Sequence, residues 1–277
     1  MTNGFFTDTT ICIGCKACEV ACKQWNQLPG DGYAFTGNSY DNTVALGSTT
    51  WRHVAFVEQM TPSNEPVAPS RWLMMSDVCK HCTNAGCLEA CPTGAIVRNE
   101  FDDVFIQPDV CNGCGYCVPS CPFGVVDLIA HDDYPARRTF ESDGRSFDDA
   151  LQKHGGVAGK CTLCYDRQKD GLVPACAKAC PTESIHFGDI ETLKVRARER
   201  VGQLRATGVD AYLYGVDEDT SVGDLNGFFL LTDRPEVYNL PERPVLPSTH
   251  QSAGYTSAAL AAAALTLVGY ALFRTTR

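Results

Sequence analysis

The residues of this chain best suited to chemistry are its 16 cysteines, which fall into four sets of four with none left over. The first and third sets are spaced C-x2-C-x2-C-x3-C, the second C-x2-C-x4-C-x3-C and the fourth C-x2-C-x11-C-x3-C. In chain order the sets are Cys12, Cys15, Cys18 and Cys22; Cys79, Cys82, Cys87 and Cys91; Cys111, Cys114, Cys117 and Cys121; and Cys161, Cys164, Cys176 and Cys180. A chain of 277 residues can bury a core without disulfides. Its first residues lack a secretory signal, so we expect the cysteines to ligate metal.

Three kinds of site could use these cysteines. A disulfide framework requires an oxidising compartment and leaves the regular spacing unexplained. A structural zinc ion could account for the fourth set, whereas the cysteines of the first and third sets are too close together for one tetrahedral metal. The C-x2-C-x2-C-x3-C run is typical of bacterial ferredoxins, in which thiolates hold cubane [4Fe-4S] clusters. Four such clusters would use every cysteine once, and this interpretation is favoured.

The fourth cysteine of each set is expected to ligate a different cluster from the first three, because it lies about one helical turn further on and points away. Pro92, Pro122 and Pro181 follow fourth cysteines as in the ferredoxin signature, while Lys23 departs from it. The expected ligand groups are Cys12, Cys15, Cys18 with Cys180; Cys161, Cys164, Cys176 with Cys22; Cys79, Cys82, Cys87 with Cys121; and Cys111, Cys114, Cys117 with Cys91. This pairing predicts an α+β fold of two interleaved ferredoxin-like modules.

The surrounding elements are expected to be short. Strands are predicted over residues 53–57, 95–98, 104–106 and 125–129, and a charged amphipathic helix over 191–206. The predicted division is the first half of the outer module at 1–24, an insertion at 25–75, the inner module at 76–130, a connector at 131–158, the second half of the outer module at 159–190, a helix and Pro-marked extended connector at 191–253, and a transmembrane helix at 254–273.

The C-terminal run from Gly254 to Phe273 carries no charge and has about the length needed to cross a bilayer core. The alternative is a buried or peripheral helix. Arg274 and Arg277 follow the run at once, and the positive-inside tendency then places the C-terminus in the cytoplasm and the cluster domain outside.

Other features narrow the function. The formal net charge of −10 argues against nucleic-acid binding. No G-x-G-x-x-G motif, paired carboxylates or Ser/His/Asp order indicates a catalytic site, so no catalytic residue is predicted. Backbone N–H groups at Gly14, Gly86, Gly113 and Gly115 are expected to donate to cluster sulfur.

Four charged or titratable side chains lie beside cluster cysteines. Lys16, Lys80 and Lys160 could raise a cluster potential by favouring the extra electron, and the alternative is solvated surface lysine. His81 lies between Cys79 and Cys82, and with a complete cysteine set it is expected to support the cluster rather than to ligate it.

The segments Cys12–Cys22, Lys160–Arg167 and Ala179–Thr182 resemble those of iron–sulfur subunits in the dimethyl-sulfoxide-reductase family of molybdopterin oxidoreductases. Within that family the chain looks most like the formate dehydrogenase β subunits. That likeness is carried by Cys79–Cys82, Gly86–Leu88, Cys114–Cys117, Cys121–Phe123, Ile185–Gly188, and Pro235–Tyr238 shortly before a single apolar helix.

This resemblance implies a non-catalytic role. Four [4Fe-4S] clusters would carry electrons from a catalytic α subunit, which holds a molybdenum or tungsten pterin and oxidises formate, to a membrane cytochrome b γ subunit that reduces quinone. It also implies that the outer module docks the catalytic subunit, so that the cluster of Cys12 is first and the cluster of Cys111 last. The alternative is the same electron-transfer subunit in another complex of the family, with a sulfur, arsenic or N-oxide substrate.

Overall fold

The computed structural model describes residues 2–30, 43, 45–59, 70–129, 156–217 and 219–275. The helices are α1 Ala17–Asn26, α2 Gly86–Glu89, α4 Tyr165–Lys169, α5 Ala175–Ala179, α6 Ile190–Ala206 and α7 Gln251–Thr275. The strands are β1 Asn3–Asp8, β2 Arg52–Gln59, β3 Arg71–Val78, β4 Ile96–Arg98, β5 Val104–Ile106, β6 Asp127–Ile129, β7 Val157–Gly159, β8 Ile185–Asp189, β9 Tyr212–Tyr214 and β10 Gly227–Leu231. Most of the expected connector 131–158, parts of the expected insertion 25–75, and Arg277 lie outside the described residues.

A four-stranded sheet joins segments that are far apart in the sequence. Its order is β8-β1-β10-β9, with β1 antiparallel to β8 and parallel to β10. The N-terminal strand leads directly to the first cysteine set, and β8 follows the last cysteine of the fourth set. The sheet therefore holds the first and fourth sets on one framework.

The central strand β10 is buried along its whole length. Its sequence, Gly227–Leu231, is a continuous apolar run, and Leu225 and Phe228 pack in one core with Leu193 and Ala197 of α6. A short apolar run that ends at turn residues is typical of a strand covered on both faces. The expectation that residues after the helix in 191–253 form only an extended connector was therefore wrong for β9 and β10.

Within the described ranges, three two-stranded ribbons accompany this sheet. The pairs are β2 with β3, β4 with β5, and β6 with β7, all antiparallel. The strands predicted at 53–57, 95–98 and 104–106 are confirmed to within one or two residues at each end. The strand predicted at 125–129 is shorter, and it pairs with β7, just before the fourth cysteine set, rather than with its sequence neighbours β4 and β5.

Helix packing also brings the first and fourth sets together. Helix α1, which carries Cys18 and Cys22, packs against α5, which carries Cys176. Trp25 of α1 also donates a hydrogen bond of 2.8 Å to Asp166 of α4. The guanidinium of Arg167 lies over the Trp25 ring, 4.3 Å from the ring centroid.

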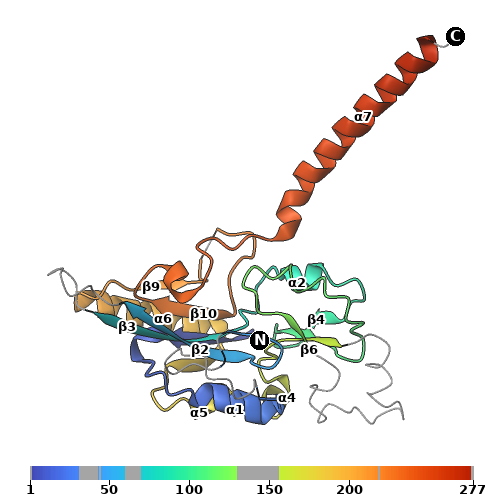
Figure 1. The fold of residues 1–277 in the computed structure, drawn as a ribbon. Coiled ribbons are helices and arrows are strands. Elements are labelled where there is room, and N and C mark those ends of the chain that lie inside the picture. The colour runs from blue at the N-terminus through green and yellow to red at the C-terminus, as the bar shows by residue number, and fades with distance from the viewer. Residues whose placement is uncertain are drawn as a thin grey trace, which may run out of the picture.

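The predicted C-terminal helix is present as α7, which leaves the body of the molecule as a single rod (Figure 1). Residues Pro247–Arg274 are long and apolar enough to cross a membrane, and no part of their most apolar stretch is buried. Leu260 and Leu265 are 73 % and 74 % exposed. An apolar face this exposed requires lipid or protein around it, so α7 is a candidate single-pass membrane anchor.

Candidate iron–sulfur centres

The loop of the first set is shaped by close packing. Gly14 has a φ of +64°, and a Cβ there would lie 2.5 Å from the Phe56 ring and 2.8 Å from the Met74 sulfur. Lys16 is also left-handed, with a φ of 57°, and α1 begins directly after it. The backbone N–H of Gly14 donates to the Cys12 sulfur. The loop thus turns tightly enough to aim three thiols at one place.

Cys180 of the fourth set joins the first three cysteines of the first set. One cavity is lined by all four, and we call them the first-set group: Cys12, Cys15, Cys18 and Cys180. Cys15 is exposed and Cys18 is buried. Burial raises the pKa of the Cys18 thiol to about 11, although Arg52 and Ser76 act in the opposite direction.

Cys22 lies apart from its sequence neighbours. Burial, together with the nearby Cys161, Cys176 and Cys164, raises its pKa well above the usual thiol value. These four buried residues form the fourth-set group: Cys161, Cys164, Cys176 and Cys22. The pKa of Cys161 is likewise raised to about 12, mainly by burial.

The second set meets the last cysteine of the third. One cavity is lined by the second-set group: Cys79, Cys82, Cys87 and Cys121. Burial raises the pKa of Cys87 to about 12, and the thiols of Cys79 and Cys121 contribute to the rise. In this group too, a cysteine from another part of the chain completes a set of four.

The third set is completed in the same way, by the last cysteine of the second set. Burial and the neighbouring Cys111, Cys114 and Cys91 raise the pKa of Cys117 to about 11. We call these four residues the third-set group: Cys111, Cys114, Cys117 and Cys91. Cys114 is exposed, as is the neighbouring Tyr116 at 63 %.

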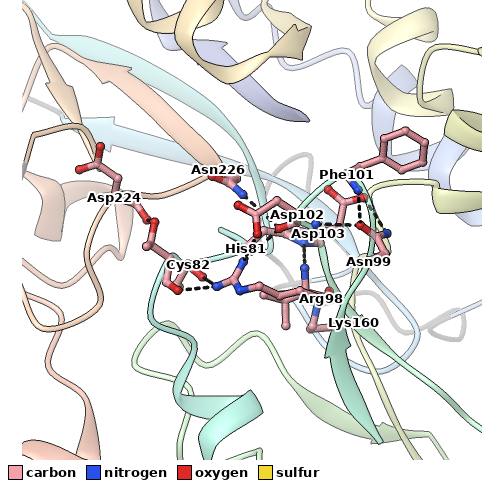
Figure 2. A network of polar contacts seen from close by, with 12 residues as sticks. His81, Cys82, Arg98, Asn99, Phe101, Asp102, Asp103, Lys160, Asp224 and Asn226 are labelled. Carbon is pink, nitrogen blue, oxygen red and sulfur yellow. Dashed lines mark hydrogen bonds and ion pairs between the residues drawn. The ribbon is translucent and has the colours of Figure 1, made fainter. Parts of the chain in front are cut away.

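A polar network fixes the loop of the second set against the β4–β5 hairpin. Figure 2 shows Arg98 reaching from β4 to the carbonyl oxygen of Cys82, while its other nitrogen contacts Asp102. The nitrogen that contacts Cys82 also donates to the carbonyl oxygen of Thr83. Asn226, which immediately precedes β10, donates to the carbonyl of Asp102 at 3.3 Å. The network ties this cysteine loop to both the hairpin and the central sheet.

His81 is placed as a supporting residue. Its Nδ1 accepts a hydrogen bond of 3.2 Å from the backbone N–H of Val104, and its buried Nε2 has no partner among the described residues. Burial lowers the pKa of His81 well below its usual value, as do Lys160 and Arg98. The ring is therefore neutral, with its proton on Nε2, and it lines the cavity of the second-set group.

The three lysines differ in their surroundings. Lys80 and Lys160 are only 1 % and 2 % exposed, so the surface alternative is wrong for both. Lys160 donates to the carbonyl of Cys161 at 3.1 Å, and although burial opposes its charge, Cys79 and Cys87 help raise its pKa. Lys16 lines the first-set cavity and pairs with Glu19 at 3.6 Å.

The backbone donors to sulfur come mostly from residues other than the predicted glycines. Apart from Gly14, the N–H groups of Val125, Ala158 and Leu163 lie 3.3–3.5 Å from the sulfurs of Cys121, Cys111 and Cys161. Gly86 has a different role, because a Cβ there would lie 2.4 Å from the Ser120 carbonyl oxygen. It allows α2 to approach the third-set loop closely.

The four groups suit clusters better than single ions. Among the described residues, no three His, Cys, Asp or Glu side chains are arranged to hold one metal ion. The first-set and second-set groups instead surround cavities, as ligands at the corners of a cubane would. Burial raises the pKa of several of these thiols, including Cys18, Cys87 and Cys161, which therefore stay protonated until a metal displaces the proton. The residues therefore fit [4Fe-4S] clusters.

Thiols of neighbouring groups lie close enough to interact electrostatically, and these interactions place the four groups in one order. Cys18 of the first-set group faces Cys176 of the fourth-set group, and Cys161 of the fourth-set group faces Cys79 of the second. Cys87 of the second-set group in turn faces Cys117 of the third. The groups thus follow one another as first, fourth, second and third.

Arg52 is a buried residue of the site that the sequence analysis missed. Arg52 begins β2, is 1 % exposed, and faces cysteines of both the first-set and fourth-set groups. Nothing in its local sequence distinguishes it from a surface arginine, because its cysteine neighbours are 30 or more residues away in the chain.

Comparison with known proteins agrees with the motifs. A family model described as a 4Fe-4S dicluster domain matches residues 70–134 and 149–190, and a second model of the same description matches 11–95. The formate dehydrogenase iron–sulfur subunit of Haemophilus influenzae is 38 % identical over 241 residues, which cover 86 % of this chain and 68 % of that protein.

Further relatives extend the comparison. The formate dehydrogenase-O iron–sulfur subunit of Escherichia coli is 38 % identical over 249 residues, covering 87 % of this chain and 72 % of the relative. A Halobacterium salinarum protein named as an iron–sulfur subunit of dimethyl sulfoxide reductase is 32 % identical over 230 residues, covering 80 % and 82 %. The resemblance inferred from the motifs is confirmed, and the chain belongs to the family of [4Fe-4S] iron–sulfur subunits of formate dehydrogenases and related dimethyl sulfoxide reductases.

Proposed function

We propose that this chain carries electrons through four [4Fe-4S] clusters, from a molybdenum- or tungsten-pterin subunit that oxidises formate to a membrane cytochrome b subunit that reduces quinone. The observation that carries the proposal is the arrangement of all 16 cysteines as four groups of four in a row. Each group would hold one cluster through the thiolates named above. The clusters would supply one-electron redox chemistry, and the protein would set their spacing and surroundings.

The groups also support two interleaved modules. The outer module would contain the first-set and fourth-set groups, and the inner module the second-set and third-set groups. The pairing of β1 with β8 and the packing of α1 on α5 support the outer module, since both contacts join the two ends of the predicted unit. The inner module is contiguous in sequence between β3 and β6.

Exposed cysteines at the two ends of the row of groups support docking of a partner protein at each end. Cys15 and Cys114 are the exposed cysteines, and they belong to the first-set and third-set groups. Both have exposed apolar neighbours, Ile13 at 58 % and Tyr116 at 63 %. Each end is therefore suited to receive a partner protein within electron-transfer reach of a cluster.

The contacts of the residues just before α7 support the third-set group as the end of the row nearest the membrane. Ser248, just before α7, donates to Glu89 at the end of α2 at 2.8 Å, and Leu246 packs beside Gly86. The candidate anchor thus leaves the body next to the inner module (Figure 1). The catalytic subunit would then dock at the first-set group. Arg274, directly after the apolar run, favours a cytoplasmic C-terminus and a cluster domain on the outer face.

A second candidate is the same electron-transfer role in a complex with a different substrate. The 32 % identity to a relative named for dimethyl sulfoxide reductase favours keeping it. The catalytic subunit determines the substrate, so the two candidates are separated by purifying the native complex and identifying its large subunit through mass spectrometry. If the large subunit acts on another substrate, that substrate takes the place of formate in the proposed function.

The order of the clusters is tested by Cys114→Ser in the assembled complex. Formate oxidation with an artificial dye should persist, because a dye accepts electrons upstream, whereas quinone reduction should fall at least tenfold. The control is Arg71→Gln, which removes a partly exposed ion pair with Asp233 and should change neither activity. Equal loss of both activities in assembled Cys114→Ser would contradict an exit at the third-set group.

A further inference from the structure

Arg52 occupies the boundary between two of the cysteine groups. It is the first residue of β2 and lies opposite Val78 in the β2–β3 ribbon. Its guanidinium is surrounded electrostatically by Cys18 of the first-set group and by Cys176, Cys161 and Cys22 of the fourth-set group.

The hydrogen bonds of Arg52 leave part of the guanidinium unused. Nη1 donates to the Ser76 hydroxyl at 2.9 Å and lies 3.4 Å from the Ser76 carbonyl oxygen. Nε and Nη2 are buried and have no partner among the described residues. Together these two nitrogens carry three N–H donors. Buried N–H donors of a charged group destabilise the fold unless acceptors satisfy them.

Ser76 extends the same contact to a ligand. Its Oγ lies 3.2 Å from the sulfur of Cys18. Since an arginine can only donate, the Ser76 oxygen accepts from Arg52, and its own hydrogen is free for the sulfur. A thiolate at Cys18 would accept it. Arg52 therefore reaches the first-set group through Ser76 as well as through its own charge.

The charge of Arg52 lacks a conventional partner. Across the described ranges no carboxylate forms an ion pair with it, and its guanidinium stacks over the Phe5 ring at 4.7 Å. A buried cation is tolerated only when anions or strong acceptors surround it. Stacking on Phe5 alone would leave both the charge and the three donors uncompensated. Cubane clusters held by thiolates carry net negative charge and sulfur acceptors, and they would lie on both sides of this residue.

We infer that Arg52 is a positioning residue for electron transfer within the outer module: its free N–H groups donate to the sulfur of both adjoining clusters, and its fixed charge raises both reduction potentials together. The inference rests on the cluster arrangement proposed above. In the step it supports, one electron leaves the reduced cluster of the first-set group and reduces the oxidised cluster of the fourth-set group. Arg52 stays protonated throughout, so no proton is transferred.

Because Arg52 raises both reduction potentials together, the difference in potential between the two clusters stays small. A cation that served one cluster alone would trap the electron there. A cation between the two favours the extra electron on each side equally, which keeps the transfer fast in both directions. This explains why an arginine, whose planar fork presents donors in two directions, occupies the position rather than a lysine.

The test is a redox titration of the full-length holoprotein, followed by electron paramagnetic resonance. Arg52→Gln should lower the reduction equilibrium constant of two of the four clusters at least tenfold, about 59 mV for a one-electron couple. Cys15→Ser and Cys114→Ser serve as markers for the signals of the two end clusters. Arg71→Gln, a half-exposed arginine on the partner strand β3, is the matched control and should move none.

Ser76→Ala provides a milder variant that keeps the arginine. It should lower the equilibrium constant of the first-set cluster alone, by about threefold or more, because it removes the donor to Cys18. Unchanged potentials in iron-replete Arg52→Gln would overturn the inference. If Arg52→Gln does not retain its clusters, an unshifted Ser76→Ala would overturn it instead. The iron content distinguishes failure of the proposed clusters from failure of the role of Arg52. Wild-type protein with too little iron for four clusters refutes the proposed clusters. An Arg52→Gln variant with a complete iron content and unchanged potentials refutes only the role of Arg52.

Discussion

The contact between β1 and β10 can be tested by adding one methyl group at Gly4. A Cβ at this position would lie 2.2 Å from the backbone oxygen of Asn226 and 2.5 Å from the Ile190 side chain. Asn226 uses that oxygen to accept a hydrogen bond of 2.7 Å from Phe5. Because the obstructing atom is backbone, β1 and β10 must separate to admit the methyl group.

The expected cost has two parts. Overpacking in a closed site costs about 1–3 kcal/mol, and loss of the Phe5 hydrogen bond costs about 1 kcal/mol more. Gly4→Ala should therefore lower the free energy of unfolding by about 2–4 kcal/mol, which corresponds to a fall in Tm of about 5–15 °C for a domain of this size. The first-set and fourth-set clusters should be lost first, since β1 and β8 flank their ligands.

The assay is thermal unfolding followed by circular dichroism, together with the visible absorbance of the clusters. Gly202→Ala is the matched control, because this glycine lies inside α6 with no atom within 4 Å of an added Cβ. Alanine is the better helix former by about 0.5–1 kcal/mol, so this variant should be as stable as wild type or slightly more. A Tm of Gly4→Ala equal to that of wild type would refute the packing described for β1.

Four further predictions concern the ligand groups, the membrane anchor, the membrane side of the cluster domain, and a buried acid. Cys22→Ser should perturb the cluster of Cys161, Cys164 and Cys176 and leave that of Cys12 intact; a change confined to the latter in electron paramagnetic resonance would contradict the crossed pairing. A chain ending at Gln251 should move to the soluble fraction when its membrane partners are absent, and sedimentation with membranes would argue against an anchor in α7. In membranes, protease added from outside should cut the cluster domain, and its survival would place that domain in the cytoplasm. Burial raises the pKa of Asp103 to about 7, so the folded state holds a proton that the unfolded state has lost, and stability should fall by roughly 2–3 kcal/mol from pH 5 to pH 7. Asp103→Asn should abolish this slope in denaturant titrations, and an unchanged slope would show that another group causes it.

The local parts of the site could be predicted from the sequence because the ligand spacing is itself local. The loop from Cys12 to Cys18 and its glycine turn at Gly14 are contained within a few residues. The grouping of Cys22 with Cys161 followed from a helical rule, since α1 carries Cys22 one turn beyond Cys18. The described structure brings together the same cysteines that the rule pairs.

The parts that sequence reasoning missed depend on distant contacts. The sequence of β10 is apolar enough to predict a buried strand, but the prolines from Pro235 onward indicate an extended connector. Its partner β1 lies more than 200 residues earlier. Arg52 and Ser76 likewise acquire their role only when β2 packs against α1 and pairs with β3, which no local pattern reveals.

The number of clusters is the central claim, and metal analysis of the anaerobically purified full chain tests it most directly. Four cysteine groups, each holding one [4Fe-4S] cluster, predict about 16 iron atoms per chain and four paramagnetic centres on full reduction. The iron content should be accompanied by an equal amount of acid-labile sulfide. A content near four iron atoms, or zinc in stoichiometric amount, would contradict the account.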